Sequence, residues 1–210
     1  NVKVKHGDET EINGQGPVIT DEAIEELFAK LDTLTSDDIL VLAGSIPNTL
    51  PDDIYERIMA RLEGKGIRIV VDATKDLLLN VLKYHPFLIK PNNHELGEMF
   101  NTVCKTTDDI VHYAKELQKM GARNVLISMA GDGAILITEE GDAIQIGTPK
   151  GKVVNSVGAG DSMVAGFIAG YLKNGSYEEA LKSGNAAGSA TAFSEGLASL
   201  EMYNAMLEQI

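Results

Sequence analysis

The sequence predicts an α/β fold in which helices cover both faces of a mostly parallel sheet. Short apolar runs alternate along the chain with segments of about 10–15 residues whose apolar side chains recur at helical spacing. The apolar runs are continuous, which indicates strands buried on both faces, as in parallel sheets. With 210 residues and 44% hydrophobic content, the chain is long enough for one domain with a sizeable core.

The first two predicted strands differ from the rest. Residues 2–5 and 10–13 alternate between apolar and polar side chains and flank residues 6–9, a pattern typical of a β-hairpin. Since alternation indicates one exposed face, we expect a separate flap here. The later strands are expected over 39–42, 67–71, 87–89 and 125–127, with a second hairpin formed by 134–138 and 143–146.

The predicted helices have recognisable ends and faces. Thr20 is placed to cap a helix whose first turn is acidic. A second helix carries Ile54, Ile58 and Leu62 on one face and stops at Gly64. Further helices are expected over 75–84, 94–101, 107–120, 159–173, 177–193 and 199–209.

Composition excludes several classes of partner. A net charge of −13 argues against nucleic acid or an anionic membrane surface, so small-molecule partners are expected. No stretch approaches the roughly 20 apolar residues of a membrane span, and the charged first residues do not form a signal peptide. The single cysteine, Cys104, excludes an intrachain disulfide and fits a reducing cytoplasm.

Polar and glycine-rich residues recur where the predicted strands end. Ligands of open α/β sheets bind at the carboxyl ends of the strands. Any such loop also needs turn residues, so one loop alone carries little weight, but five together favour a site. They are Gly44–Ser45, Asp72, residues 90–92, residues 128–133 and residues 158–161.

The stretch Gly158-Ala159-Gly160-Asp161 puts three small residues and an acid at a helix start. Backbone amides in such a turn can converge on an anion. If the anion is a phosphoryl group in transfer, Asp161 would take the proton of the attacking hydroxyl. The alternative is that Asp161 only caps the helix.

The stretch KPNNHE, residues 90–95, has the residue types of a magnesium and phosphate site. Asn92 and Glu95 are three positions apart at a helix start and could share one Mg²⁺ or its waters, and Lys90 could reach a phosphate. The alternative is a capping arrangement, in which Glu95 favours the helix N-terminus.

The stretch SMAGDG, residues 128–133, leaves a strand and enters a hairpin through Gly131 and Gly133. Small residues here would let a nucleotide approach the backbone closely, although a simple tight turn has the same composition.

Other signatures are absent from the sequence. It contains no G-x-x-x-x-G-K-[ST] loop and no G-x-G-x-x-G after a strand. The four histidines show no metal-ligand spacing, so they are interpreted as surface or loop residues. No arrangement of serine, histidine and aspartate typical of a serine hydrolase stands out.

Five stretches in one order are more specific than any of them alone: TEINGQGP at 10–17, AGSIP at 43–47, KPNNHE at 90–95, SMAGDG at 128–133 and VGAGDS at 157–162. Over the whole chain, this set resembles the ribokinase-like (phosphofructokinase-B) family of sugar kinases. Residues 10–17 resemble its hexose-phosphate branch, which includes bacterial 1-phosphofructokinase and tagatose-6-phosphate kinase.

The resemblance implies ATP and Mg²⁺ as cofactors and a role for each matching residue. Asp161 matches the catalytic base, and Gly158, Ala159 and Gly160 match the anion hole. Asn92 and Glu95 match the motif that organises Mg²⁺. The nucleotide-contacting positions correspond to Lys90, Ser128, Met129, Ala130, Gly131, Asp132, Gly133, Gly160 and, lining the adenine pocket, Asn185.

The resemblance also implies a domain organisation. Residues 1–17 correspond to part of a β-stranded lid, a contact through which a homodimer could form, and residues 18–210 correspond to the α/β nucleotide-binding core. Members of the family have about 300 residues, so this chain resembles their C-terminal two thirds. We expect most sugar-binding residues to lie outside it, and we expect the 210 residues alone to be inactive.

The implied reaction is phosphorylation of a ketohexose phosphate by ATP, with fructose 1-phosphate as the favoured acceptor. Tagatose 6-phosphate is the first alternative. A ribose- or nucleoside-type acceptor is disfavoured by residues 10–17. A nucleotide-binding module without catalysis is the remaining alternative, and the retained Asp161 argues against it.

Overall fold

The computed structural model describes the backbone of residues 2–6 and 8–12 and all of residues 16–210. Six strands form one sheet in the order β3-β4-β5-β6-β7-β8. The first four are parallel and the last two pairings are antiparallel, which confirms the expected α/β fold with a mostly parallel sheet. The strands are β3 (Ile39–Ala43), β4 (Arg68–Asp72), β5 (Leu88–Ile89), β6 (Asn124–Ser128), β7 (Ala134–Ile137) and β8 (Ala143–Ile146).

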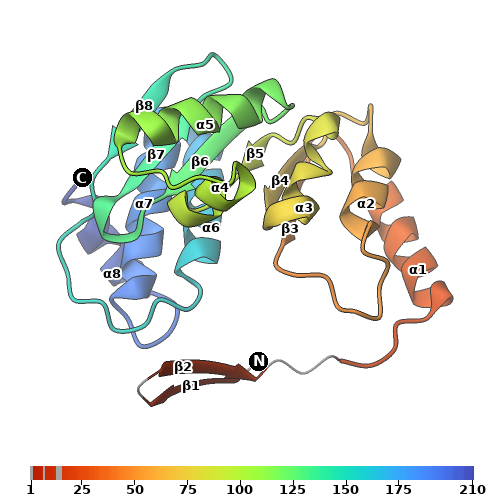
Figure 1. Ribbon diagram of the computed structural model, residues 1–210, viewed down its shortest axis with the longest axis horizontal. Coiled ribbons are helices and arrows are strands. Elements are labelled where there is room, and N and C mark those ends of the chain that lie inside the picture. Colours follow the sequence, from red (N-terminus) through yellow and green to blue (C-terminus); the bar gives the residue numbers. More distant parts are fainter. Residues whose placement is uncertain (1, 7, 13–15) are drawn as a thin grey trace.

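Helices lie on both faces of this sheet, as Figure 1 shows. One face is covered by α1 (Asp21–Asp32), α2 (Ile54–Leu62), α3 (Lys75–Leu79), α4 (Asn93–Met99) and α5 (Thr107–Lys119). The other is covered by α6 (Ala159–Asn174) and α7 (Tyr177–Ala192), and α8 (Leu200–Leu207) packs on α7. None of the helices in the described part of the chain has the length and apolar character needed to cross a bilayer.

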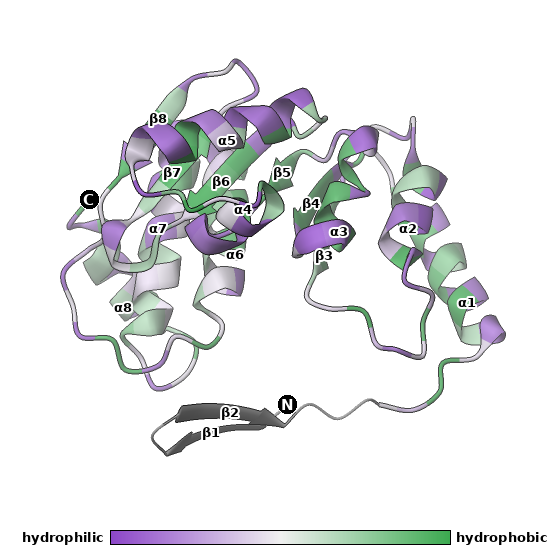
Figure 2. Ribbon diagram, in the orientation of Figure 1, coloured by the Kyte–Doolittle hydropathy of each residue, from purple (hydrophilic) through white to green (hydrophobic). Residues whose placement is uncertain are grey.

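Burial on both faces explains why the central strands are continuously apolar. Val70 and Val71 of β4 are adjacent and fully buried, yet they belong to two separate hydrophobic clusters. Val71 packs with the cluster under α2 and α5, and Val70 packs with the cluster under α6. Figure 2 accordingly shows the central strands as hydrophobic between amphipathic helices.

Close packing of α6 on α7 fixes the position of the α6 N-terminus. A Cβ on Gly166 would lie 2.6 Å from the carbonyl oxygen of Ser183, and one on Gly184 would lie 2.9 Å from the carbonyl oxygen of Met163. Larger residues at these positions would push the helices apart. Glycine therefore lets α6 lie against α7 at short range.

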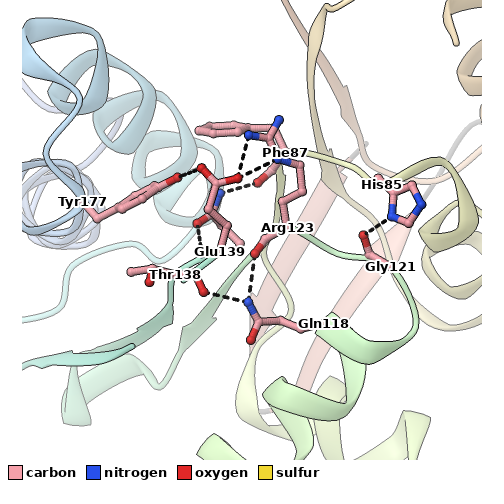
Figure 3. Close-up of polar contacts among 9 residues, drawn as sticks. His85, Phe87, Gln118, Gly121, Arg123, Thr138, Glu139 and Tyr177 are labelled. Atoms are coloured by element: carbon pink, nitrogen blue, oxygen red, sulfur yellow. Dashed lines mark hydrogen bonds and ion pairs between the residues drawn. The ribbon is translucent and has the colours of Figure 1, made fainter. Parts of the chain in front are cut away.

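A group of polar contacts around Glu139 connects strands and a helix at the end of the sheet opposite to the first turn of α6, as Figure 3 shows. Glu139 accepts a 2.6 Å hydrogen bond from the hydroxyl of Tyr177 and forms an ion pair with Arg123 at 2.6 Å. Its backbone amide donates to the side-chain oxygen of buried Asn124. These contacts join the start of α7, the end of β7 and the start of β6.

Most predicted elements differ from the observed ones by one or two residues at an end, and two of the differences change how the chain is interpreted. The helix expected over 75–84 is broken into α3 and a 3₁₀ turn at Leu82–Tyr84, followed by His85 in the left-handed region at φ 52°. Pro86 disfavours α-helical backbone at the preceding residue, so the helical segment cannot continue through His85. The break between α3 and the 3₁₀ turn has no explanation in the structure. The strand expected over 67–71 runs from 68 to 72, so Asp72 lies within β4.

The predicted N-terminal hairpin is confirmed, but its strands extend into residues 6–9, which were expected to form the turn, since His6 pairs with Asp8. β1 (Val2–His6) and β2 (Asp8–Ile12) are antiparallel, with Val2 opposite Ile12. They form their own two-stranded sheet, which lies apart from the six-stranded sheet in Figure 1. Residues 1, 7 and 13–15 lie outside the described residues. The lid and dimer roles stay predictions.

Candidate active site

The ends of β4 and β5 bring an acid and a base together. Val71 pairs with Ile89 in the parallel register, so Asp72 and Lys90 are the next residues on neighbouring strands. The Nζ atom of Lys90 lies 3.3 Å from Oδ1 of Asp72. Lys90 is buried, with 7% of its surface exposed, so its ammonium is largely removed from water. The sequence placed Asp72 at a strand end without giving it a role.

The first turn of α6 lies next to this pair. The N-cap is Gly158, with φ +80°, and no side chain caps the helix, so Asp161 does not act as the cap. The amide of Ala159 donates to the carbonyl of Ser156 at 3.2 Å. In the described part of the chain, no backbone acceptor pairs with the amides of Gly160 and Asp161. These two amides carry the partial positive charge of the helix start.

Lys90 is directed at this turn. A Cβ on Gly160 would lie 3.2 Å from the Nζ atom of Lys90. Glycine therefore allows the ammonium to approach the helix start closely. The exposed carboxylate of Asp161 follows at the next position. The structure thus brings Lys90 next to the first turn of α6, although Gly160 and Asp161 follow it by about 70 positions in the sequence.

Charges in this region interact. Burial raises the pKa of Asp72, and the negative charges of Asp161 and Glu95 add to the rise. The ammonium of Lys90 acts in the opposite direction. Three carboxylates and one ammonium therefore influence one another electrostatically. Among the described residues, however, no three acidic, histidine or cysteine side chains are grouped closely enough to hold a metal ion by themselves.

Asn92 and Glu95 form the capping box that the sequence left as an alternative. Oδ1 of Asn92 accepts from the amides of His94 and Glu95, and Oε2 of Glu95 accepts from the amide of Asn92 at 2.8 Å. This arrangement uses only one oxygen of the Glu95 carboxylate. Capping and a contribution to metal binding are therefore compatible for Glu95, whereas Oδ1 of Asn92 already accepts two hydrogen bonds.

The third predicted stretch lies beside the second. Ser128 forms an isolated parallel bridge with Asn92, and its amide donates to the carbonyl of Pro91. Ala130–Asp132 is a 3₁₀ turn, and a Cβ on Gly133 would lie within 2 Å of the Ile146 carbonyl oxygen. Gly133 is thus required by the neighbouring strand. At Gly131, in contrast, an added Cβ would meet no protein atom within 4 Å, so a contact with a ligand there stays a prediction.

Asn185 lies inside the protein. It is 2% exposed, and its side-chain amide donates to the carbonyl of Gly147 at 2.8 Å. Thr148, next in the chain, donates from its hydroxyl to the carbonyl of Ala130. The loop after β8 is thus fastened both to α7 and to the turn after β6. Two of the predicted nucleotide-contacting residues, Ala130 and Asn185, are therefore joined through this loop.

Comparison with known proteins agrees with this geometry. The profile of the pfkB family carbohydrate kinases matches residues 1–202. The chain belongs to the pfkB family of carbohydrate kinases. Within this family, a 1-phosphofructokinase from Bacillus subtilis is 50% identical over 210 residues, which cover 100% of this chain and 69% of that protein. A D-tagatose-1-phosphate kinase from Bacillus licheniformis is 35% identical over 211 residues, with the same shares.

Solved structures of pfkB-type proteins have the same fold. A crystal structure assigned as a phosphofructokinase from Staphylococcus aureus has a TM-score of 0.90 and 44% identity, covering 99% of this chain and 67% of that chain. Phosphofructokinase-2 from Escherichia coli, in complex with substrates and products, has a TM-score of 0.88 and 29% identity, covering 96% and 66%. This pfkB chain therefore spans about two thirds of the length of these relatives.

Proposed function

We propose that the protein containing this chain is a sugar-phosphate kinase that transfers the γ-phosphoryl group of ATP to a free hydroxyl of a ketohexose phosphate. One observation carries the proposal: a buried ammonium, Lys90, and the amides of Gly160 and Asp161 converge beside an exposed carboxylate. Positive donors next to a base suit phosphoryl transfer to a hydroxyl, which depends on charge stabilisation and positioning.

Each group has a task in the proposed reaction. The acceptor oxygen attacks the γ-phosphorus, and the bond from this phosphorus to the oxygen bridging to ADP breaks. Asp161 takes the hydroxyl proton. The amides of Gly160 and Asp161 and the ammonium of Lys90 stabilise the negative charge on the transferred group. Removing one such donor typically costs about 10²–10³-fold in rate.

The donor set fits Mg²⁺ bound together with ATP. Mg²⁺ prefers oxygen ligands and is commonly held by one or two carboxylates, waters and substrate phosphates. Glu95 has one carboxylate oxygen outside the capping box, and its charge acts on Asp72. Asn92 would contribute chiefly by positioning Glu95. When bound, the metal would neutralise part of the phosphate charge. The free oxygen of Glu95 supports magnesium as cofactor.

We favour fructose 1-phosphate as the acceptor, phosphorylated at its 6-hydroxyl. The relative from Bacillus subtilis, at 50% identity, is named a 1-phosphofructokinase, and the relative from Bacillus licheniformis is named a D-tagatose-1-phosphate kinase. Both names specify a ketohexose 1-phosphate. Tagatose 1-phosphate therefore joins tagatose 6-phosphate as an alternative acceptor.

The test is an ADP-release assay on the complete gene product with MgATP and five acceptors in parallel. These are fructose 1-phosphate, fructose 6-phosphate, tagatose 1-phosphate, tagatose 6-phosphate and ribose. The expected result is the highest kcat/KM with fructose 1-phosphate. A higher value with another ketohexose phosphate would replace the acceptor and keep the reaction. ATP binding without turnover of any acceptor would instead support a nucleotide-binding module.

A further inference from the structure

The buried ammonium of Lys90 needs a partner. A charge removed from water is costly unless it is paired, and breaking a buried pair leaves the other charge uncompensated. Within residues 16–210, the ion pair of Lys90 is the one with Asp72, whose side chain is 19% exposed. The other described pairs join more exposed side chains; Lys75 and Glu98, for example, are 71% and 59% exposed.

The sheet directs both side chains toward α6. Val70 and Leu88 pack in the cluster under α6, and they lie two positions before Asp72 and Lys90 on their strands. Side chains two positions apart on an extended chain point to the same face. Asp72 and Lys90 therefore project on the α6 side, which agrees with the short distance from the Lys90 ammonium to a Cβ built on Gly160.

The ammonium of Lys90 lies beside the start of α6, a position that is electrostatically unfavourable for a cation as long as no anion is bound there. The start of α6 carries partial positive charge, so it repels Lys90 until a negative group lies between them. Asp72 supplies the attraction that keeps Lys90 at this position. We propose that Asp72 is a positioning residue that acts through Lys90, holding its ammonium at the first turn of α6 where the transferred phosphoryl group is bound. This inference rests on the proposed kinase function.

The substitution Asp72→Asn keeps the shape of the side chain and removes its charge. Lys90 then loses its partner, and kcat is expected to fall about 10–100-fold, the size typical of losing a group that orients a functional side chain. KM for the sugar phosphate is expected to change less than threefold. Glu98→Gln, which breaks the exposed pair with Lys75, is the matched control and should leave kcat unchanged.

A double-mutant cycle separates positioning from an independent role. Asp72→Asn and Lys90→Gln are measured singly and together in the complete gene product, with thermal melts to verify folding. If Asp72 acts through Lys90, adding Asp72→Asn to Lys90→Gln changes kcat less than threefold. An equal loss in both backgrounds would overturn the proposal. The proposal would also be overturned if Asp72→Asn, introduced into the Lys90→Gln variant, changed the Mg²⁺ concentration that gives the half-maximal rate.

A second readout keeps the inference separate from the proposed function. The same four proteins are titrated with a non-hydrolysable ATP analogue and Mg²⁺ by calorimetry. The expected result is that Asp72→Asn weakens binding only when Lys90 is present. If no sugar phosphate is phosphorylated, the proposed function fails, while this coupling still supports the pairing. Additive effects on binding, or none from either variant, would refute it.

Discussion

The side-chain amide of Asn185 on α7 donates a 2.8 Å hydrogen bond to the carbonyl of Gly147, 38 positions earlier in the chain. Asn185 is buried and Gly147 is exposed, so this part-buried bond fastens the loop after β8 to the helix. Thr148 in the same loop is bonded to Ala130. The frame around the proposed nucleotide site therefore depends on one buried amide.

Asn185→Ala should destabilise the protein. The variant removes the donor of one hydrogen bond to an exposed carbonyl, whose net loss costs about 0.5–1.5 kcal/mol in the free energy of unfolding. Urea denaturation of both proteins measures the difference. Asn204→Ala, at an exposed position on α8, is the control and should change the unfolding free energy by less than about 0.5 kcal/mol. Equal effects of the two variants would show that the hydrogen bond of Asn185 contributes nothing to stability.

Gly160→Ala should reduce activity without loss of stability. The new Cβ would lie 3.2 Å from the Nζ atom of Lys90, so the ammonium has to shift by a few tenths of an ångström. Alanine is also about 1 kcal/mol more favourable than glycine within a helix. We expect kcat to fall at least about 10-fold, since misplacing a catalytic group is costly. The melting temperature is expected to stay equal or rise.

Gly131→Ala is the matched control for this substitution. No atom lies within 4 Å of a Cβ at Gly131, so the added methyl group meets no protein neighbour. If Gly131 faces the nucleotide, KM for ATP rises and kcat with saturating ATP changes little. Wild-type kcat in Gly160→Ala would show that the position of Lys90 is unimportant for the reaction.

Glu139→Gln should remove a pH-dependent part of stability. Burial alone would raise the pKa of Glu139, but the hydrogen bond from Tyr177 and the guanidinium of Arg123 outweigh it, so the pKa lies below its ordinary value of 4.5. A carboxyl with a lowered pKa stabilises the folded state above its unfolded pKa, and this contribution is lost as the pH falls through the folded value. The wild type should therefore exceed the variant in stability at pH 7.

Denaturation at a series of pH values from 7 to about 3 checks this prediction. The difference in unfolding free energy between wild type and Glu139→Gln should shrink as the pH falls below 4.5. Glu140→Gln, at the exposed neighbouring position, controls for the loss of one carboxylate. A difference that stays constant down to pH 3 would contradict an ionised Glu139 as the source.

Most of the architecture could be predicted because its signals are local. Apolar runs of the right length gave the parallel strands, and Thr20 accepts from the amide of Ala23 as its capping position predicts. The break between α3 and the following turn was missed, because the apolar spacing of Leu78, Val81 and Leu82 continues through it. The left-handed backbone at His85 leaves no mark in that spacing.

The site was predicted less completely, because its parts meet only in three dimensions. The sequence supplies Lys90 and Asp161 as candidates, but it cannot show that the ammonium lies against Gly160. Asp72 is an ordinary strand-end residue until the register of β4 and β5 places it opposite Lys90. Asn185 shows the reverse case, since its polar side chain is consistent with a ligand contact and is found bonded to Gly147.

Asp161→Asn tests the proposed base directly. The substitution preserves size and removes the ability to take a proton, while the helix cap at Gly158 is unaffected because no side chain forms it. We expect kcat to fall roughly 10²–10⁴-fold, the usual contribution of a general base. ATP affinity, measured by calorimetry, should change less than threefold, because the backbone amides of the first turn remain in place.

The control for Asp161→Asn is the same chemical change at Asp37, an exposed acid near the start of β3. Asp37→Asn should have wild-type kcat and stability. If the Asp161→Asn variant had the kcat of the wild type, Asp161 would not be the base. A loss of ATP affinity as large as the loss of kcat would point instead to a role in binding. The separation of kcat from affinity is therefore the decisive result, because only a group that acts in the transition state lowers the rate without weakening the bound nucleotide.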